Sequence, residues 1–209
     1  MSLVLYNHDL LADAYKVRLL LSLLGLHHER PTVAILPGHG NDAPTYRQLN
    51  AVGTVPTLVD GDIVLTRPEA MLVHLAERHD PGGTWLPAEP AMRAAVFDML
   101  ALAAGELRAA EEARLEAMLG LTPRLNHAFQ AARQAFRLLE DHLVRRHLDG
   151  EAFLAGATPT IADIAVFPAV ALSADFGLGM EEFPRLLIWA RRIHKLDGFI
   201  TAPGVREVV

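Results

Sequence analysis

The sequence predicts two domains of different class, an α/β domain followed by an all-helical domain. Runs of apolar and β-branched residues typical of strands occur only in the first 80 residues, at 3–6, 29–35 and 57–65. A turn-rich stretch, Asp80-Pro81-Gly82-Gly83, ends this region, and the apolar residues beyond it recur at helical spacing. The expected boundaries are 1–80 for the α/β domain, 81–88 for a linker and 89–209 for the helical domain.

The first half of the α/β domain is expected to run strand, helix, strand. Leu3–Tyr6 is short and apolar, as a strand requires. Asp13 is a candidate N-cap for a buried apolar helix, and Gly25 lies where such a helix ends. The β-branched residues of 29–35 predict a second strand, and Pro31 favours an edge position for it.

The second half is expected to run loop, short helix, hairpin, helix. Pro37-Gly38-His39-Gly40 predicts the loop, and 45–50 the short helix. Asp60-Gly61 separates two apolar runs, which is a strong signal for an antiparallel hairpin. Pro68 suits the first turn of a helix that ends near His79. Together these elements predict a mixed four-stranded sheet covered by helices.

Two signals organise the helical domain. Apolar residues between Arg124 and Leu148 recur at intervals of three and four, as on one face of a helix, and a segment from Leu186 to Leu196 repeats this spacing. Between them, Thr160-Ile161-Ala162-Asp163 resembles a capping box with Asp in place of Glu. No strand pattern occurs here, so we expect helices throughout.

Composition excludes several classes of function. The 209 residues are 51% hydrophobic and 21% charged with a net charge of −6, which argues against disorder and against a nucleic-acid-binding surface. The absence of Cys excludes disulfides, thiolate metal sites and a Cys nucleophile. No apolar run approaches the roughly 20 residues of a membrane span, and the opening MSLVLYNHD does not resemble a signal peptide. We therefore expect a cytoplasmic protein.

Histidine spacing argues against a metal site. His74 and His79 are five residues apart, as are His142 and His147. Ligands on one helix face are three or four residues apart, so neither pair is expected to share a face. The sequence predicts no bound metal.

The motifs resemble those of the cytosolic glutathione transferases over nearly the whole chain. The stretch from Asn50 to His79, with Val55-Pro56 ahead of a strand, is similar to the cis-proline half of their thioredoxin-like domain. LADAYKVRLLLSLLGL at 11–26 resembles the first helix of the family. FLAGATPTIADIAVFPAVAL resembles its capping box and buried aspartate, and FPRLLIWARRIHKLDGF its C-terminal region.

The resemblance implies a homodimer that uses glutathione as substrate on small electrophiles, in detoxification. It places glutathione along the backbone of Val55, ahead of a cis Val55-Pro56 bond. Thr54 stands where the family often has a glutamine that binds the ligand backbone. His39 resembles a family histidine near the glycine carboxylate of glutathione.

One departure from the family concerns the thiol. Relatives carry a Ser, Cys or Tyr that donates a hydrogen bond to the glutathione sulfur, but this chain has Leu11 and Ala12 at the usual Ser or Cys position. Tyr6, at the end of the first strand, is the candidate replacement. The register of that strand leaves open whether Tyr6 or Asn7 faces the site.

A second departure concerns the γ-glutamyl end of glutathione. Where the family has an acid and a serine, this chain has Arg67-Pro68. Proline offers no N–H, and arginine repels an ammonium while attracting a carboxylate. Glu69 either reaches the ligand amine or is a solvated first-turn residue that favours the helix dipole.

These departures leave two functions open. The first is a glutathione transferase, and the second is a non-catalytic binding module for another anionic ligand or a protein partner. A further charged run is interpreted as a solvated helix face; its members are Glu106, Arg108, Glu111, Glu112, Arg114 and Glu116.

Overall fold

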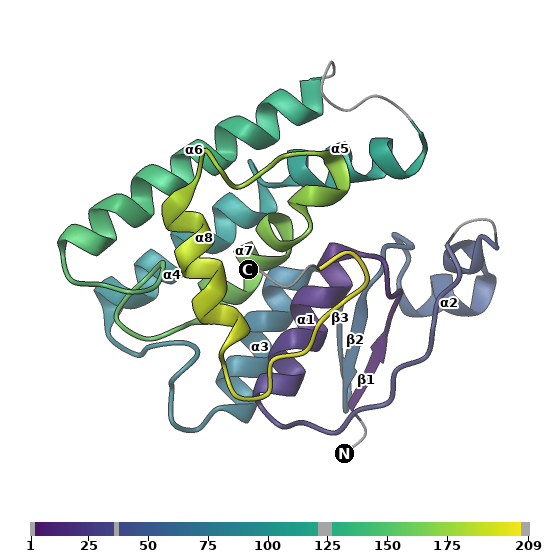
Figure 1. Ribbon diagram of the computed structural model, residues 1–209. Coiled ribbons are helices and arrows are strands. Elements are labelled where there is room, and N and C mark those ends of the chain that lie inside the picture. Colours follow the sequence, from purple (N-terminus) through teal and green to yellow (C-terminus); the bar gives the residue numbers. More distant parts are fainter. Residues whose placement is uncertain (1–2, 36–37, 121–126, 206–209) are drawn as a thin grey trace.

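The computed structural model describes residues 3–35, 38–120 and 127–205 and joins a small α/β layer to a bundle of helices (Figure 1). Pro37 and residues 124–126, which enter two of the predictions above, lie outside these ranges. The α/β part contains β1 (Leu3–Tyr6), α1 (Ala12–Leu23), the 3-10 turn η1 (Gly40–Asp42), α2 (Pro44–Leu49), β2 (Thr57–Asp60), β3 (Ile63–Leu65) and α3 (Pro68–His79). The helical part contains α4 (Pro90–Ala104), α5 (Arg108–Met118), α6 (His127–Leu148), α7 (Ile161–Ala171), η3 (Ser173–Phe176) and α8 (Pro184–His194). The proposed linker at 81–88 falls between α3 and α4 and stays a prediction.

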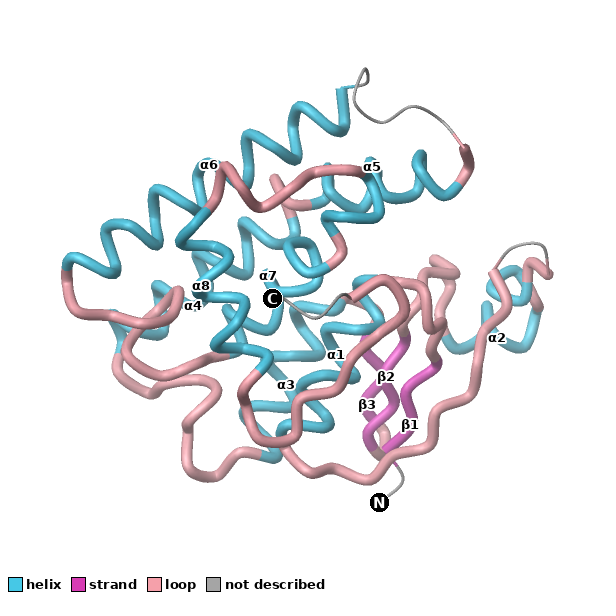
Figure 2. Tube along the Cα trace, viewed as in Figure 1, coloured by secondary structure: helices cyan, strands magenta, loops and turns pink. Residues whose placement is uncertain are grey.

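The sheet is antiparallel in the order β1-β2-β3, and its register pairs Leu5 with Leu58 and Leu58 with Leu65. Helices α1 and α3 lie on one side of it and α2 on the other (Figures 1 and 2). Leu5 and Leu58 are buried, as alternation in a strand requires of the residues that face the core. The hairpin and the helix after it are therefore confirmed.

The expected fourth strand does not form as a regular strand. Residues 29–33 run alongside β1 with parallel bridges at Val4–Glu29 and Asn7–Thr32. Hydrogen bonds join Leu5 N to Glu29 O and Asn7 N to Pro31 O. In a regular ladder, a third hydrogen bond would lie between these two, and its donor would be the backbone N–H of residue 31. Residue 31 is proline, which has no N–H. The segment pairs with the edge as predicted, but the ladder is interrupted.

Helix α1 is the buried helix that the sequence predicts, but its start differs. It begins at Ala12 with Leu11 as N-cap, and no side chain caps it. Asp13 lies in the first turn, so its expected role as N-cap is wrong. Gly25 adopts a φ of 65° just beyond the helix end, in the left-handed region where glycine is favoured.

Helix α7 is the centre of the molecule, since it packs against both α1 and α4 and most of its residues are buried. The Thr160 hydroxyl and the Asp163 carboxylate form the expected capping box. Asp163 is fully buried and also accepts a hydrogen bond from Trp189 Nε1 at 2.8 Å. Among the described helices, none is long and apolar enough to cross a membrane.

Candidate functional site

The segment before β2 presents a free backbone edge. The Val55–Pro56 bond is cis, as the family resemblance implies. Asn50 and Tyr46 hold the segment, because Asn50 Nδ2 and Tyr46 Oη both donate to the Thr54 carbonyl, at 2.8 and 2.6 Å. Within the described residues, the N–H and C=O of half-buried Val55 form no hydrogen bond. They are available to pair with the backbone of an extended ligand.

The start of α3 lies beside this edge. Thr54 Oγ1 donates to the Thr66 carbonyl at 3.4 Å and so joins the two segments. Arg67 is the N-cap of α3, is exposed, and forms no ion pair with any described residue. Pro68 takes the first helical position, and no side chain caps the helix. Proline therefore removes only one of the N–H donors, and those of the next two residues remain for an anion.

A cluster of five charged side chains lies between the two domains. We call Asp13, Lys16, Glu69, Arg108 and Glu111 the interdomain charge cluster. Lys16, only 4% exposed, has its Nζ 2.7 Å from Asp13 and 3.3 Å from Glu69. Its distance to Glu111 is 3.7 Å. Arg108 lies 3.5 Å from Asp13 and 3.4 Å from Glu111. Three carboxylates thus share two cations.

The carboxyl groups of this cluster differ in their readiness to ionise. Burial opposes ionisation of Asp13, but the Lys16 ammonium keeps the pKa of Asp13 below its ordinary value. Burial and the neighbouring Asp13 carboxylate raise the pKa of Glu111 to about 7. Glu111 is therefore the member of the cluster that gains or loses its proton near neutral pH.

Two interpretations of charged residues are wrong. Glu69 is not solvated, because its side chain is 19% exposed and pairs with Lys16. The charged run of α5 is not a solvated face throughout: Glu111 belongs to the cluster, and Arg114 is 8% exposed and pairs with Asp175 at 2.7 Å. Sequence reasoning also missed Lys16. The available signal was a lysine on a mostly apolar, buried helix, since a buried ammonium requires counter-charges nearby.

Tyr6 and Asn7 occupy different environments. The Tyr6 ring packs edge-on against Tyr46 of α2, with ring centroids 5.8 Å apart. Asn7 is fully buried and donates from Nδ2 to Asp9 Oδ1 at 2.9 Å. The sheet alternation thus directs Tyr6 to the side of α2, and the role of either residue toward a thiol stays a prediction.

His39 lies in the loop that faces the same segment. Its side chain is 67% exposed and lies 3.8 Å from Asp42. Asn41 Nδ2 donates to the Gly53 carbonyl at 3.2 Å, which anchors this loop two residues from Val55. His39, Thr54, Val55 and Arg67 therefore come from segments that hydrogen bonds hold next to one another.

An open groove of about 510 Å³ lies between α3 and α4. Apolar side chains form most of it, among them Leu65, Val73, Phe97 and Leu100. Glu69 lines one end, so the groove reaches the interdomain charge cluster. Phe97 is 42% exposed in it.

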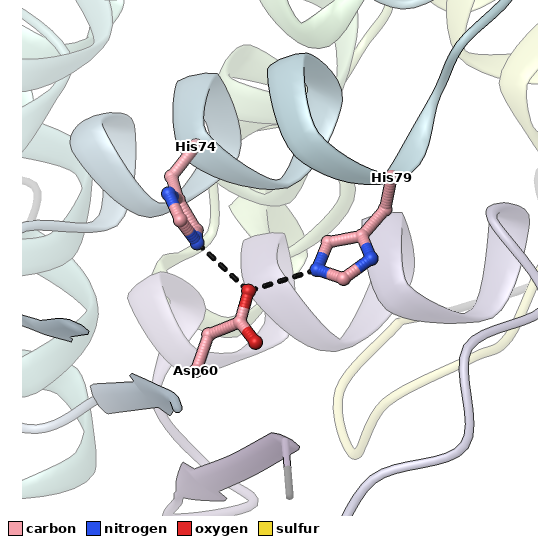
Figure 3. A group of neighbouring side chains, drawn as sticks. All are labelled: Asp60, His74 and His79. Atoms are coloured by element: carbon pink, nitrogen blue, oxygen red, sulfur yellow. Dashed lines mark hydrogen bonds and ion pairs between the residues drawn. The ribbon is translucent and has the colours of Figure 1, made fainter. Parts of the chain in front are cut away.

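One of the two histidine pairs is brought together in the structure, although its spacing predicts that the two residues share no helix face. His74 and His79 both contact Asp60 at the end of β2 (Figure 3). His142, by contrast, bonds to the Leu154 carbonyl. His79 is the last residue of α3, and the acid of the adjacent strand lies between the two rings. A carboxylate from another element thus joins two residues that share no helix face.

An α/β layer with a cis-proline edge, followed by a helical domain, defines the glutathione-transferase class of fold. The family model for the N-terminal domain of glutathione S-transferases matches residues 14–78, and that for the C-terminal domain matches residues 89–192. The chain belongs to the glutathione S-transferase family.

Relatives match over most of their length. Glutathione S-transferase 1 of Dianthus caryophyllus is 29% identical over 187 residues, which cover 87% of this chain and 82% of that protein. The probable maleylacetoacetate isomerase of Vibrio cholerae is 27% identical, with 97% and 95% covered. The crystal structure of a glutathione S-transferase from Xanthobacter autotrophicus Py2 superposes with a TM-score of 0.83 at 27% identity, covering 97% and 98%.

Proposed function

We propose that the protein is a glutathione-dependent transferase that acts on small electrophiles. The observation that carries this proposal is the free backbone edge of Val55 beside a cation, Arg67, and an acid, Glu69, at the start of α3. Glutathione is an extended peptide whose γ-glutamyl end bears one ammonium and one carboxylate. The site offers a complementary group for each part.

The γ-glutamyl end is assigned to α3. Arg67 and the uncapped N–H groups after Pro68 hold the α-carboxylate, while Glu69, already paired with a cation, accepts from the α-ammonium. The cysteinyl backbone pairs with Val55, next to Thr54 and Pro56. His39 meets the glycine carboxylate from the loop that Asn41 anchors. This arrangement replaces the acid and serine of the family with a different donor set.

Two donors are proposed for the thiolate. One is the N-terminus of α1, where Leu11 and Ala12 carry no hydroxyl but where no side chain caps the helix. Free N–H groups there lower the pKa of a thiol. Asp13 does not oppose them, since its charge is paired with Lys16. The other donor is the Tyr6 hydroxyl.

The first experiment is calorimetric titration of the protein with glutathione at neutral pH, together with a turnover assay on an aryl halide. Saturable binding with turnover supports the transferase. Binding without turnover contradicts transfer to this electrophile. No binding at millimolar glutathione overturns the proposed transferase and supports the alternative, a binding module for another anionic ligand or a protein partner.

Arg67→Ala is expected to weaken glutathione binding about tenfold or more, because a hydrogen bond to a charged group contributes roughly 1.5–3 kcal/mol. The matched control is Arg145→Ala, an exposed arginine of α6, which should bind as the unmodified protein does. Tighter binding by Arg67→Ala would mean that Arg67 repels the ligand ammonium instead of holding its carboxylate.

Tyr6→Phe distinguishes the thiol donors. A fall in turnover of about tenfold or more, with folding intact, assigns the role to Tyr6, on the scale of losing one preorganised donor. Turnover within about twofold of the unmodified protein leaves the α1 N-terminus as the donor. The measurement is the pH dependence of turnover, which also reports the pKa of the bound thiol.

We further infer that the protein forms a homodimer through the α3–α4 groove. We also propose that it acts in the cytoplasm and that its role is detoxification. The exposed apolar lining of the groove supports the dimer. The family resemblance supports the cytoplasmic location, which cell fractionation tests.

A further inference from the structure

The side chains of Asp60, His74 and His79 converge (Figure 3). Asp60 ends β2, whereas the cis proline precedes its first residue, so the group lies at the opposite end of the strand. His74 Nε2 lies 2.9 Å and His79 Nε2 lies 2.8 Å from the same oxygen, Asp60 Oδ2. One donor atom from each residue lies within 4.8 Å of the other two. The Asp60 side chain is 3% exposed, and those of the histidines are 16% and 23% exposed.

Two elements place this trio. Asp60 is the last residue of β2, and α3 runs back over the sheet after the hairpin. On a helix, residues five apart point in directions roughly 140° from one another, so two such histidines need a third group between them to meet. Asp60 is that group, because it comes from the strand beneath the helix.

We propose that Asp60, His74 and His79 bind a divalent transition metal ion, with zinc as the best match. Two imidazole nitrogens and one carboxylate oxygen are the donors of three-ligand zinc sites, which keep a fourth position open. Zinc–ligand bonds of about 2.0–2.1 Å in a tetrahedral site separate the donor atoms by roughly 3.3 Å. Binding therefore requires the two partly buried rings to move away from Asp60 by about 0.5 Å. Their exposure also gives the ion a path from solvent.

One cation competes for the same oxygen. Arg78 Nε lies 3.2 Å from Asp60 Oδ2, and its side chain is 41% exposed. The bound ion takes the place of this guanidinium, which turns toward solvent. The imidazoles bind through Nε2, so the protons they donate to Asp60 in the ion-free site are released or move to Nδ1.

The trio is separate from the proposed glutathione site. Asp60 lies three residues beyond Thr57, which follows the cis proline, and three residues of strand span roughly 10 Å. The ion therefore contacts neither Val55 nor the start of α3. It ties β2 to the C-terminal end of α3 and stabilises the folded chain by an amount that rises with the logarithm of the free ion concentration once this exceeds the dissociation constant.

The test is calorimetric titration of the chelator-treated full chain with zinc chloride, with thermal denaturation in parallel. One zinc per chain and a higher melting temperature are expected. His74→Gln and His79→Gln should each weaken binding at least about tenfold while the ion-free variants stay folded. His147→Gln removes an exposed histidine of α6 and should bind as the unmodified protein does.

Because His74 also lines the α3–α4 groove, light scattering of each variant shows whether association has changed. Loss of zinc affinity at unchanged mass supports the trio as the ligands. Absence of stoichiometric zinc binding overturns the proposal and leaves Asp60 as a hydrogen-bond acceptor that joins strand to helix. Unchanged affinity in both histidine variants overturns it as well, since the ion then binds elsewhere.

Discussion

Lys16 shows how one residue sets the electrostatics of the site. Its side chain is buried, and its ammonium reaches carboxylates from α1, α3 and α5. A buried cation of this kind is stable only with such partners. Its presence neutralises Asp13, whose charge would otherwise oppose a thiolate at the start of α1.

Glu111 is expected to make stability depend on pH. Its folded-state pKa of about 7 lies above the ordinary value of 4.5, so ionising it costs folding free energy as the pH rises through this range. Glu111→Gln removes that cost. The melting temperature of the variant, relative to that of the unmodified protein, should therefore be higher at about pH 8 than at about pH 5.5.

The control for Glu111→Gln is Glu112→Gln, which changes the exposed neighbour on α5. Its melting temperature should differ from that of the unmodified protein by the same amount at both pH values. A difference for Glu111→Gln that does not vary with pH would contradict the raised pKa.

At the scale of elements, Asp163 is expected to contribute more to the free energy of unfolding than an ordinary helix cap does. Its carboxylate accepts from the N–H groups of Leu154 and Thr160, at 3.0 and 2.8 Å, and from Trp189 Nε1. Asp163→Ala leaves three buried donors without their acceptor. Since each such donor costs roughly 1–3 kcal/mol, we expect a loss of about 3 kcal/mol or more in the free energy of unfolding.

Urea denaturation measures this loss, and Glu89→Ala is the matched variant. Glu89 caps α4 by accepting from the N–H groups of Ala91 and Met92, but on an exposed surface where water replaces it. The loss in free energy of unfolding should therefore be clearly smaller for Glu89→Ala than for Asp163→Ala. Equal losses in the two variants would show that burial of Asp163 adds nothing to its capping.

Elements with a local signal are the ones that the sequence predicts well. The Asp60-Gly61 hairpin, the helix that starts at Pro68 and the capping box at Thr160 each depend on residues close in the chain. The strand at 29–35 was expected from β-branched residues, but Pro31 lacks the one N–H that would have continued its ladder. The strand propensity of a segment does not report whether each of its residues can form a hydrogen bond with a partner strand.

At the scale of the molecule, the family and the fold class follow from the order of motifs, whereas the charges of the site do not. The residues of the interdomain charge cluster come from three helices. Two of them that form an ion pair, Lys16 of α1 and Glu69 of α3, are 53 residues apart in the sequence. The charge spacing within α5 predicts a solvated face for Glu111. This prediction fails because Glu111 is covered by its contact with Lys16 of α1, which the sequence of α5 does not show. The same limitation hid the convergence of His74 and His79 on Asp60.

The proposed homodimer is tested at the α3–α4 groove. Phe97 exposes 42% of its surface there, beside an ion pair that joins Arg93 of α4 to Glu77 of α3. Phe97→Glu places a carboxylate among the apolar side chains of the groove, where a second copy would exclude the water that solvates it. Light scattering coupled to size-exclusion chromatography should show twice the chain mass for the unmodified protein and a single chain mass for the variant.

Leu148→Glu makes the same chemical change at an apolar residue that is 79% exposed at the end of α6, outside the groove. It should leave the mass at twice that of the chain. A monomeric unmodified protein would overturn the homodimer itself. A Phe97→Glu variant that stays dimeric would show that the copies associate through another face, and the apolar groove beside Glu69 would then be open to a ligand instead.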